Sequence, residues 1–328
     1  MKFFIGPMSK NVVDTILDFC DTYTTDIVFI PSRRQIESTG GYVNNWTTSE
    51  FYNYIQSKSP NRKVLLERDH GGPGQGQSDD DGFQSLEVDS KYMNIVHIDP
   101  WKKYPKYEDG LAQTVQMIQY VFTKNPSIEF EIGTEQGIRP FCVEELDALV
   151  CDLRLLLTPE EYNQIKYLVI QCGTQLLEKT NIGDFDAEKL TSMLEVCKKH
   201  NLIAKEHNGD WVDTATIQKK ASLGLTCINI APEFGEIETC VILNKLKMNP
   251  SDFETFYRIC LESGKWKKWV SPSFNPEENK ETLIKICGHY VFTNPEFQQL
   301  KQNYKDIDTE IQAAILRRLM ELHGIFYE

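Results

Sequence analysis

The sequence lacks several features that would assign a chain to a class at once. No stretch approaches about 18 consecutive apolar residues, and the apolar start from Met1 to Pro7 is too short for a signal peptide. Basic residues are comparatively few: 35 Lys and Arg stand against 48 Asp and Glu, giving a net charge of −13. The overall negative charge of the protein therefore does not attract the phosphate backbone of a nucleic acid. We expect a cytoplasmic protein that binds neither a membrane nor nucleic acid.

The nine cysteines include no C-x-x-C pair. Most lie inside apolar runs, which predicts reduced, buried thiols rather than disulfides or a metal cluster. Cys172 is the one candidate for a chemical role.

The remaining composition is that of a soluble globular protein, with 41% hydrophobic and 25% charged residues. Short apolar runs alternate with helical segments, which is typical of β/α units and a parallel sheet. Eight runs are interpreted as strands, at residues 3–6, 26–31, 63–67, 94–99, 128–132, 167–171, 202–205 and 226–230. Helices are predicted between them at 11–20, 49–58, 110–123, 143–157, 187–200 and 214–222.

Eight β/α units match the size of a (β/α)₈ TIM barrel, which we predict over residues 1–245. A doubly wound sheet is the alternative, but no G-x-G-x-x-G follows the first strand. Two helix starts are well marked, by Thr48 with Glu50 and by Thr158 followed by Pro159. Residues 246–328 are predicted to form a helical C-terminal extension that caps the barrel or makes an oligomer contact.

In such a barrel, functional residues follow the carboxyl ends of the strands. His70 and His207 follow two different strands, and each has a carboxylate and a glycine nearby. Imidazole and carboxylate are the usual ligands of Zn²⁺ and similar ions, so we predict a divalent metal, most simply Zn²⁺, at these two histidines. Further ligands could come from Glu135, Glu206 or Asp99, which spacing does not rank. The alternative for an Asp-His pair is a cap and a surface histidine.

The loop from Gly71 to Gly76 would let backbone amides approach an anion, although it matches neither the P-loop nor the dinucleotide fingerprint and could be a plain loop. Arg33 and Arg34 could hold a phosphate or carboxylate, or form a solvated pair. His97 lies within an apolar run, which favours a packed core residue. Structural roles are also expected for His200, His289 and His323.

Several short stretches at the strand ends resemble the class II tagatose-bisphosphate aldolase family, most closely its partner subunit, usually described as non-catalytic. They occur in the family's order across residues 1 to about 245, and residues 272–327 resemble that subunit's helical C-terminus. The stretches are Gly40-Gly41-Tyr42 with Thr48 to Phe51, Asp69 to Pro73, His97 to Asp99, Ile132 to Glu135, Glu206-His207 with Asp210, and Asn229 to Pro232.

The resemblance implies a metal-dependent barrel of the aldolase type. The family's Asp-His pair after strand 3, an acid/base and a metal ligand, corresponds to Asp69 and His70. The strand-7 metal histidine corresponds to His207, and the asparagine that holds the ketose phosphate corresponds to Asn229. The ion would polarise a carbonyl.

One family residue is missing. Catalytic members carry a metal histidine after strand 6, where this chain has Gly173-Thr174 followed by Gln175 and Leu176. Either Glu135, Glu206 or water completes a different site, or the site is vestigial.

The leading hypothesis is a metal-dependent aldolase-type lyase acting on a phosphorylated sugar or related hydroxycarbonyl compound. Asp69 would move the proton, with Glu135 or Glu206 assisting. The anionic end would be bound by Arg33, Gly72, Gly74 and Asn229. One alternative is a non-catalytic subunit that stabilises a separate tagatose-bisphosphate-type aldolase. The other is a sugar-phosphate isomerase or epimerase. A homo-oligomer is compatible with each.

Overall fold

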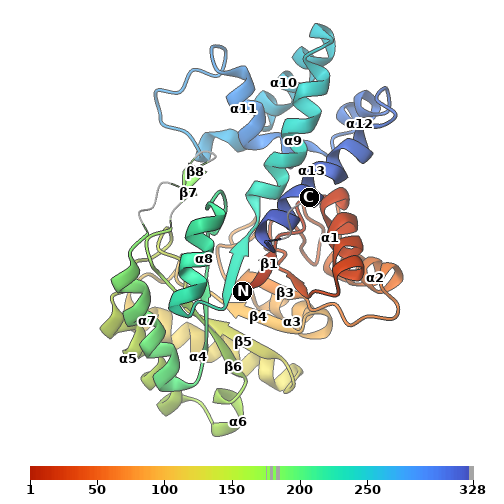
Figure 1. The fold of residues 1–328 in the computed structure, drawn as a ribbon. Coiled ribbons are helices and arrows are strands. Elements are labelled where there is room, and N and C mark those ends of the chain that lie inside the picture. Colours follow the sequence, from red (N-terminus) through yellow and green to blue (C-terminus); the bar gives the residue numbers. More distant parts are fainter. Residues whose placement is uncertain (175, 178–179, 182–184, 325–328) are drawn as a thin grey trace.

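The computed structural model describes residues 1–174, 176–177, 180–181 and 185–324; Gln175, named above at the position of the missing histidine, lies outside these residues. Eight parallel strands form one sheet that curls into a nearly closed barrel, with helices around it (Figure 1). The strands are β1 (Lys2–Ile5), β2 (Ile27–Phe29), β3 (Glu67–Gly71), β4 (Ile95–Ile98), β5 (Glu129–Ile132), β6 (Ile165–Ile170), β9 (Ile203–Glu206) and β10 (Cys227–Ile230). A separate antiparallel pair consists of β7 (Leu176–Leu177) and β8 (Thr180–Asn181).

The order of the strands confirms the (β/α)₈ barrel. Hydrogen-bonded neighbours run β2-β1-β10-β9-β6-β5-β4-β3, so β2 and β3 are the ends of the sheet. These two ends meet through isolated parallel bridges, Phe29 with Leu66 and Ser32 with Asp69. The doubly wound alternative is excluded because its sheet would stay open.

The helices of the outer layer follow the strands in turn. They are α1 (Lys10–Tyr23), α2 (Thr48–Lys58), α3 (Phe83–Tyr92), α4 (Tyr107–Lys124), α5 (Val143–Leu156), α6 (Pro159–Tyr162), α7 (Ala187–His200), α8 (Thr214–Leu223) and α9 (Pro232–Leu246). The start at Thr158 is confirmed, with a capping box to Glu161. The start of α2 differs by one residue: Thr47, not Thr48, is the N-cap and forms a capping box with Glu50.

The sequence pattern misplaced the third strand and missed helices α3 and α9. The third strand was expected at 63–67 but lies at Glu67–Gly71. Four of its five residues are charged or polar: Glu67 faces Lys205 in the barrel interior, and Arg68 on the other face bonds to Asp89 of α3. A search for apolar runs therefore places the strand too early. Helix α3 was missed for two reasons. Its N-cap residue, Gly82, has no side chain that could form a capping hydrogen bond, and few residues of the helix are apolar.

The C-terminal extension contains α10 (Pro250–Ser263), η1 (Lys265–Lys268), α11 (Lys280–Cys287), η2 (Gly288–Val291), α12 (Pro295–Lys301) and α13 (Ile307–Leu322). Helices α10 to α12 lie beyond one end of the barrel, whereas α13 packs against α1 and α9 (Figure 1). Barrel and extension share one continuous hydrophobic core. The boundary between residues 245 and 246 therefore stays a prediction.

The nine cysteines are free thiols, as predicted. Their expected burial is wrong for Cys142, which is exposed as the N-cap of α5, and Cys151 and Cys240 are only half-buried. Burial and the nearby Glu206 raise the pKa of Cys172, which stays protonated. Within the described ranges, every helix is too short or too polar to cross a bilayer.

The barrel interior contains a buried charge network on three strands. The Lys205 ammonium lies 2.7 Å from Glu67 Oε2 and 2.6 Å from Glu131 Oε2, and all three residues are 0% exposed. Burial and the neighbouring Glu131 raise the pKa of Glu67 well above its usual range. Burial opposes ionisation of Glu131 as well, but Lys205 outweighs it and lowers that pKa. The single ammonium of Lys205 thus contacts two carboxyl groups whose pKa values shift in opposite directions.

Replacing Lys205 with methionine is expected to lower the free energy of unfolding by about 3–5 kcal/mol, because it removes the only cation of this network. Chemical denaturation measures the change. The matched control is Lys91→Met, which removes an exposed lysine paired with Glu87 at 3.8 Å and should change stability by less than about 0.5 kcal/mol. Equal stabilities of the two variants would contradict the prediction.

Candidate metal centre

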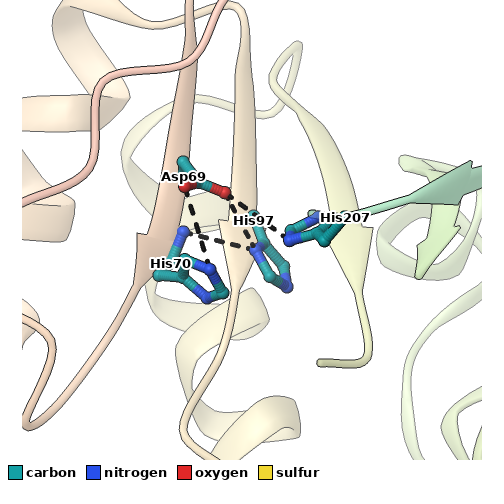
Figure 2. A group of neighbouring side chains, drawn as sticks. All are labelled: Asp69, His70, His97 and His207. Atoms are coloured by element: carbon teal, nitrogen blue, oxygen red, sulfur yellow. Dashed lines mark hydrogen bonds and ion pairs between the residues drawn. The ribbon is translucent and has the colours of Figure 1, made fainter. Parts of the chain in front are cut away.

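Four potential metal ligands from three strands meet at the carboxyl end of the barrel. Asp69 and His70 lie at the end of β3, His97 lies in β4, and His207 directly follows β9. One ligand atom from each lies within 4.8 Å of the others, and Figure 2 shows the three imidazoles around the Asp69 carboxylate. Parallel strands of a barrel all end on the same side, which brings residues far apart in the sequence to one point.

A backbone irregularity at the end of β3 turns two adjacent side chains toward the same cavity. Successive side chains of a regular strand point to opposite faces. The pairing of β3 with β4 shifts register between Arg68 and Gly71, and His70 has a φ of 47°, in the left-handed region. Such irregularities re-aim side chains next to functional sites. Asp69 and His70 consequently both line the cavity described below.

Each of the three histidines has its outer ring nitrogen next to an oxygen acceptor. His70 Nδ1 lies 2.6 Å from Asp99 Oδ2, and His207 Nε2 lies 2.9 Å from Glu131 Oε1. His97 Nε2 lies 3.0 Å from the carbonyl oxygen of Gly133. Such partners fix the ring orientation and the tautomer, as they do for metal-bound histidines.

The inner nitrogens face Asp69 without bonding to it. His70 Nε2 lies 3.8 Å from Asp69 Oδ2, and His207 Nδ1 lies 3.9 Å from Oδ1. His97 Nδ1 is also 3.8 Å from Oδ1, but it accepts a hydrogen bond of 3.2 Å from the backbone N–H of His70. The lone pair of His97 Nδ1 is therefore occupied by this hydrogen bond. The ligand atoms left available are those of His70, His207 and Asp69.

His97 has the burial expected of a core residue, at 0% exposure. Its neighbourhood was not anticipated: the ring packs against His70 and His207, with ring centroids 5.1 and 5.0 Å away. It orients the backbone of β3 rather than filling an apolar core. The sequence around Asp69 and His70 does not predict this contact, because the contact depends on the pairing register of β3 and β4.

The electrostatics of the cluster favour a positive charge at its centre. Burial disfavours the ionised form of Asp69, but the surrounding histidines, His70 first, outweigh it and lower the pKa of Asp69 below its usual range. Burial likewise opposes protonation of His70, but Asp69, Asp99 and Glu135 raise its pKa to about 10. Burial lowers the pKa of His207. A protonated His70 supplies a positive charge among the carboxylates of Asp69, Asp99 and Glu135.

The cluster opens into a cavity of about 280 Å³ between the strand ends and the C-terminal extension. Five predicted site residues line it: Asp69, His70, Glu135, His207 and Asn229. The Asn229 amide donates to Asp69 Oδ1 at 3.4 Å, and its carbonyl oxygen is buried with no hydrogen-bond partner in the described part of the chain. Glu135 accepts a hydrogen bond of 2.7 Å from Asn208.

The other predicted site residues do not line this cavity. The guanidinium of Arg33 is bonded to Glu37 at 2.6 Å, to Asp80 at 2.7 Å and to the carbonyl of Gly72 at 2.6 Å. Gly72 and Gly74 have φ of +140° and +71° and belong to the loop that Arg33 closes. The role of these three residues in anion binding stays a prediction.

Glu206 is buried at the end of β9. Its carboxylate contacts Lys220 at 2.8 Å, the Thr174 hydroxyl at 3.0 Å and the Cys172 thiol. The same Thr174 hydroxyl lies 3.0 Å from the carbonyl of His207. Glu206 thus supports the backbone that carries His207 rather than facing the cavity, and its predicted catalytic role remains untested.

Residues that were not predicted to act together also line the cavity. They include the cations Arg34, Lys102 and Lys268, and the aromatic residues Tyr42, Trp269, His289 and Tyr290. Lys102 follows the end of β4, so the strand-end rule could have found it. Lys268, Trp269, His289 and Tyr290 belong to the C-terminal extension, and no sequence pattern connects that segment to the strand ends.

A second group of potential ligands lies on the outer helices. Asp147 and Cys151 in α5 and His200 in α7 place one ligand atom each within 4.8 Å of the others. The Asp147 carboxylate is already paired with Lys199 at 2.7 Å and His200 at 2.7 Å. None of the three residues of this group lines the cavity at the strand ends.

No protein-family model matches the sequence, and no curated protein matches it by sequence. Solved structures do match the fold. A probable tagatose 6 phosphate kinase from Sinorhizobium meliloti 1021 has a TM-score of 0.79 and 14% identity, covering 99% of this chain and 100% of that one. The YdjI aldolase from Escherichia coli K12 has a TM-score of 0.59 and 14% identity, covering 99% and 89%.

Another match is the fructuronate-tagaturonate epimerase UxaE from Cohnella laeviribosi, in a glycerol complex. Its TM-score is 0.67 and its identity 10%, covering 98% of this chain and 81% of that one. Identities this low show a shared fold, which these proteins use for more than one reaction. The chain is similar in structure to aldolases and to a sugar-acid epimerase across almost its whole length.

Proposed function

We propose that this protein is a metal-dependent lyase of the aldolase type that acts on a phosphorylated sugar or related hydroxycarbonyl compound. The observation that carries the proposal is the orientation of the histidines: the outer nitrogens of His70 and His207 are held by carboxylates, and their inner nitrogens converge beside Asp69. The presence of aldolases among proteins of the same fold supports it.

The residues of the cluster fit a divalent ion. The separations of 3.8 and 3.9 Å between the Asp69 carboxylate oxygens and the inner nitrogens are too long for hydrogen bonds. Ligand atoms of His70 and His207 lie within 4.8 Å of each other, which suits one ion with metal–ligand bonds of about 2.0–2.2 Å. His70 and His207 would hold the ion, and their imidazoles favour Zn²⁺ or another borderline metal. When bound, such an ion supplies Lewis acidity that polarises a substrate carbonyl.

Two carboxylates of the cavity can move protons. Cleavage of an aldol removes a proton from the hydroxyl two carbons from the carbonyl and returns one to the carbon next to the carbonyl. Asp69 is held in place by the Asn229 amide and takes the first role in this proposal. Glu135, whose carboxylate lies 3.7 Å from His70 Nε2, is placed for the second. The side-chain carbonyl oxygen of Asn229, Oδ1, has no partner among the described residues and is available to a substrate hydroxyl.

The test is product analysis by NMR in D₂O. Purified, metal-loaded protein is incubated with a panel of ketose phosphates. We expect two shorter products, one with deuterium next to its carbonyl, or condensation of such products in the reverse direction. Failure to cleave or condense any member of the panel would reject the lyase.

A sugar isomerase or epimerase is the second candidate. It is favoured by the likeness to an epimerase of the same fold and by the presence of Asp69 and Glu135 on one cavity. The same NMR experiment identifies it, since the product would then keep the full carbon skeleton while gaining deuterium.

The absent strand-6 histidine favours a third candidate, a non-catalytic subunit of a separate aldolase. Such a subunit would copurify with the aldolase in a defined hetero-oligomer and would bind no ion of its own. Size-exclusion chromatography with metal analysis of each peak separates this outcome from the first two.

The carboxylate behind His70 provides a prediction on metal affinity. Asp99 Oδ2 lies 2.6 Å from His70 Nδ1 and contacts no other candidate ligand. Asp99→Asn should weaken metal binding about 10- to 100-fold, because it disturbs the orientation and basicity of His70. Competition with a chelator measures the affinity. Asp79→Asn, on an exposed loop, is the control. Equal affinities in Asp99→Asn and wild type would contradict the prediction.

A further inference from the structure

Three of the side chains that line the cavity are cations. Arg34, Lys102 and Lys268 come from the loop after β2, the loop after β4 and the helix η1, and all three line the cavity. Arg34 is half-buried and donates from Nε to the carbonyl of Gly76 at 3.2 Å. Within the ranges that the structure describes, none of the three forms an ion pair. This differs from Arg33, whose charge is matched by Glu37 and Asp80.

The three charges repel one another. Lys268 is exposed as a residue, but its ammonium lies over the rings of Trp269 and Tyr290, 4.4 and 5.2 Å from their centroids. The loss of water around it, followed by the charges of Arg34, Lys265 and Lys102, lowers its pKa to about 8. Burial and then Arg34 lower the pKa of Lys102. An anion among these groups would relieve the repulsion.

An unpartnered histidine faces the same cavity. His289 in η2 is 4% exposed, and neither ring nitrogen has a hydrogen-bond partner among the described residues. The ring packs against Tyr290, with centroids 4.0 Å apart, and Tyr290 in turn contacts Tyr42, whose centroid is 6.1 Å from that of His289. A buried imidazole without a hydrogen bond destabilises the folded protein. In native structures a ligand or a water molecule usually provides the missing partner. His289 can donate to an oxygen atom bound in the cavity.

We propose that Arg34, Lys102 and Lys268, together with His289, bind the phosphate group of the substrate. This assignment rests on the proposed function, because it places the reacting carbonyl beside His70 and His207, which line the same cavity. A phosphate dianion matches three unpaired cations better than a singly charged carboxylate does. A cavity of about 280 Å³ is small for a ligand site, so a single sugar phosphate can contact both the cations and the two histidines that line it.

The proposal assigns a role to the C-terminal extension. Lys268 and His289 both belong to it, so the barrel alone lacks half of the phosphate site. The extension completes the binding site instead of only covering the barrel.

Calorimetric titration of the full-length protein with inorganic phosphate tests the site. Lys268→Met should weaken phosphate binding about tenfold, and Lys102→Met combined with Lys268→Met about a hundredfold, since each charge-assisted contact contributes roughly that factor. Both lysines are exposed, so the variants should fold. The control is Lys267→Met, a neighbour in η1 that does not line the cavity and should bind phosphate like wild type.

Two further arms separate the possible readings. D-glucuronate, which carries a carboxylate and no phosphate, should bind at least about tenfold more weakly than phosphate; equal or tighter binding would overturn the assignment to phosphate. His207→Ala should bind phosphate like wild type, even if the metal chemistry fails. Unchanged binding in Lys268→Met, equal losses in Lys267→Met, or loss of binding in His207→Ala would each overturn the proposed site.

Discussion

Asp69→Asn is expected to lower turnover about a thousandfold while the protein still binds its divalent ion. The substitution keeps the shape of the side chain and its contact with Asn229, but an amide cannot accept and release the proton. General acid–base groups contribute about 10²- to 10⁴-fold to rate. Steady-state kinetics on the substrate found by the NMR panel, together with metal analysis of the same sample, measure both quantities.

The metal content distinguishes two roles of Asp69. Loss of the ion together with turnover would contradict the proton-transfer role and show that this carboxylate is a ligand. The control is Asp109→Asn on the exposed start of α4, which should keep both turnover and metal. Activity within a factor of a few of wild type in Asp69→Asn would remove Asp69 from the mechanism.

His207→Ala is expected to abolish stoichiometric metal binding and, with it, activity. The variant removes one of the two imidazoles assigned to the ion. It leaves Glu131 paired with Lys205 at 2.6 Å, so the barrel interior keeps its charge balance and the variant should fold. Metal analysis after dialysis against a metal buffer, with circular dichroism to confirm the fold, is the measurement.

His200→Ala is the matched control for this result. It removes a histidine of the second ligand group, on the outer helices, and should retain the full metal content. Loss of metal in His200→Ala with retention in His207→Ala would place the ion at Asp147, Cys151 and His200 instead.

The sequence carried enough information to predict the barrel and the meeting of His70 and His207. Alternating apolar runs and helical segments specify β/α units, and parallel strands that close into a barrel all end on one side. Side chains at these strand ends that turn toward the barrel axis can then meet. The contact between His70 and His207, with ring centroids 5.2 Å apart, follows from this topology without any local motif.

Other parts of the site depend on details that no periodicity encodes. Arg33 and Arg34 are neighbours in the sequence, yet Arg33 is bonded to Glu37 and Asp80 while Arg34 lines the cavity. Their difference is set by the path of the loop. The register shift in β3 similarly decides that His70 faces the cavity.

The contribution of the extension could not be predicted for a different reason. Lys268 lies in the segment from Gly264 to Pro276, which is rich in Trp, Lys, Ser and Pro, a composition typical of a linker. It reaches the cavity only because the helices around it fold back over the strand ends. Long-range packing of this kind leaves no trace in a local window of sequence.

The most direct test of the metal site is a diffraction experiment on crystals of the metal-loaded protein, with data collected on both sides of the absorption edge of the bound element. We predict one anomalous peak within bonding distance of His70 Nε2 and His207 Nδ1. A peak at Asp147, Cys151 and His200, or full loading with no peak at the strand ends, would contradict the proposed site.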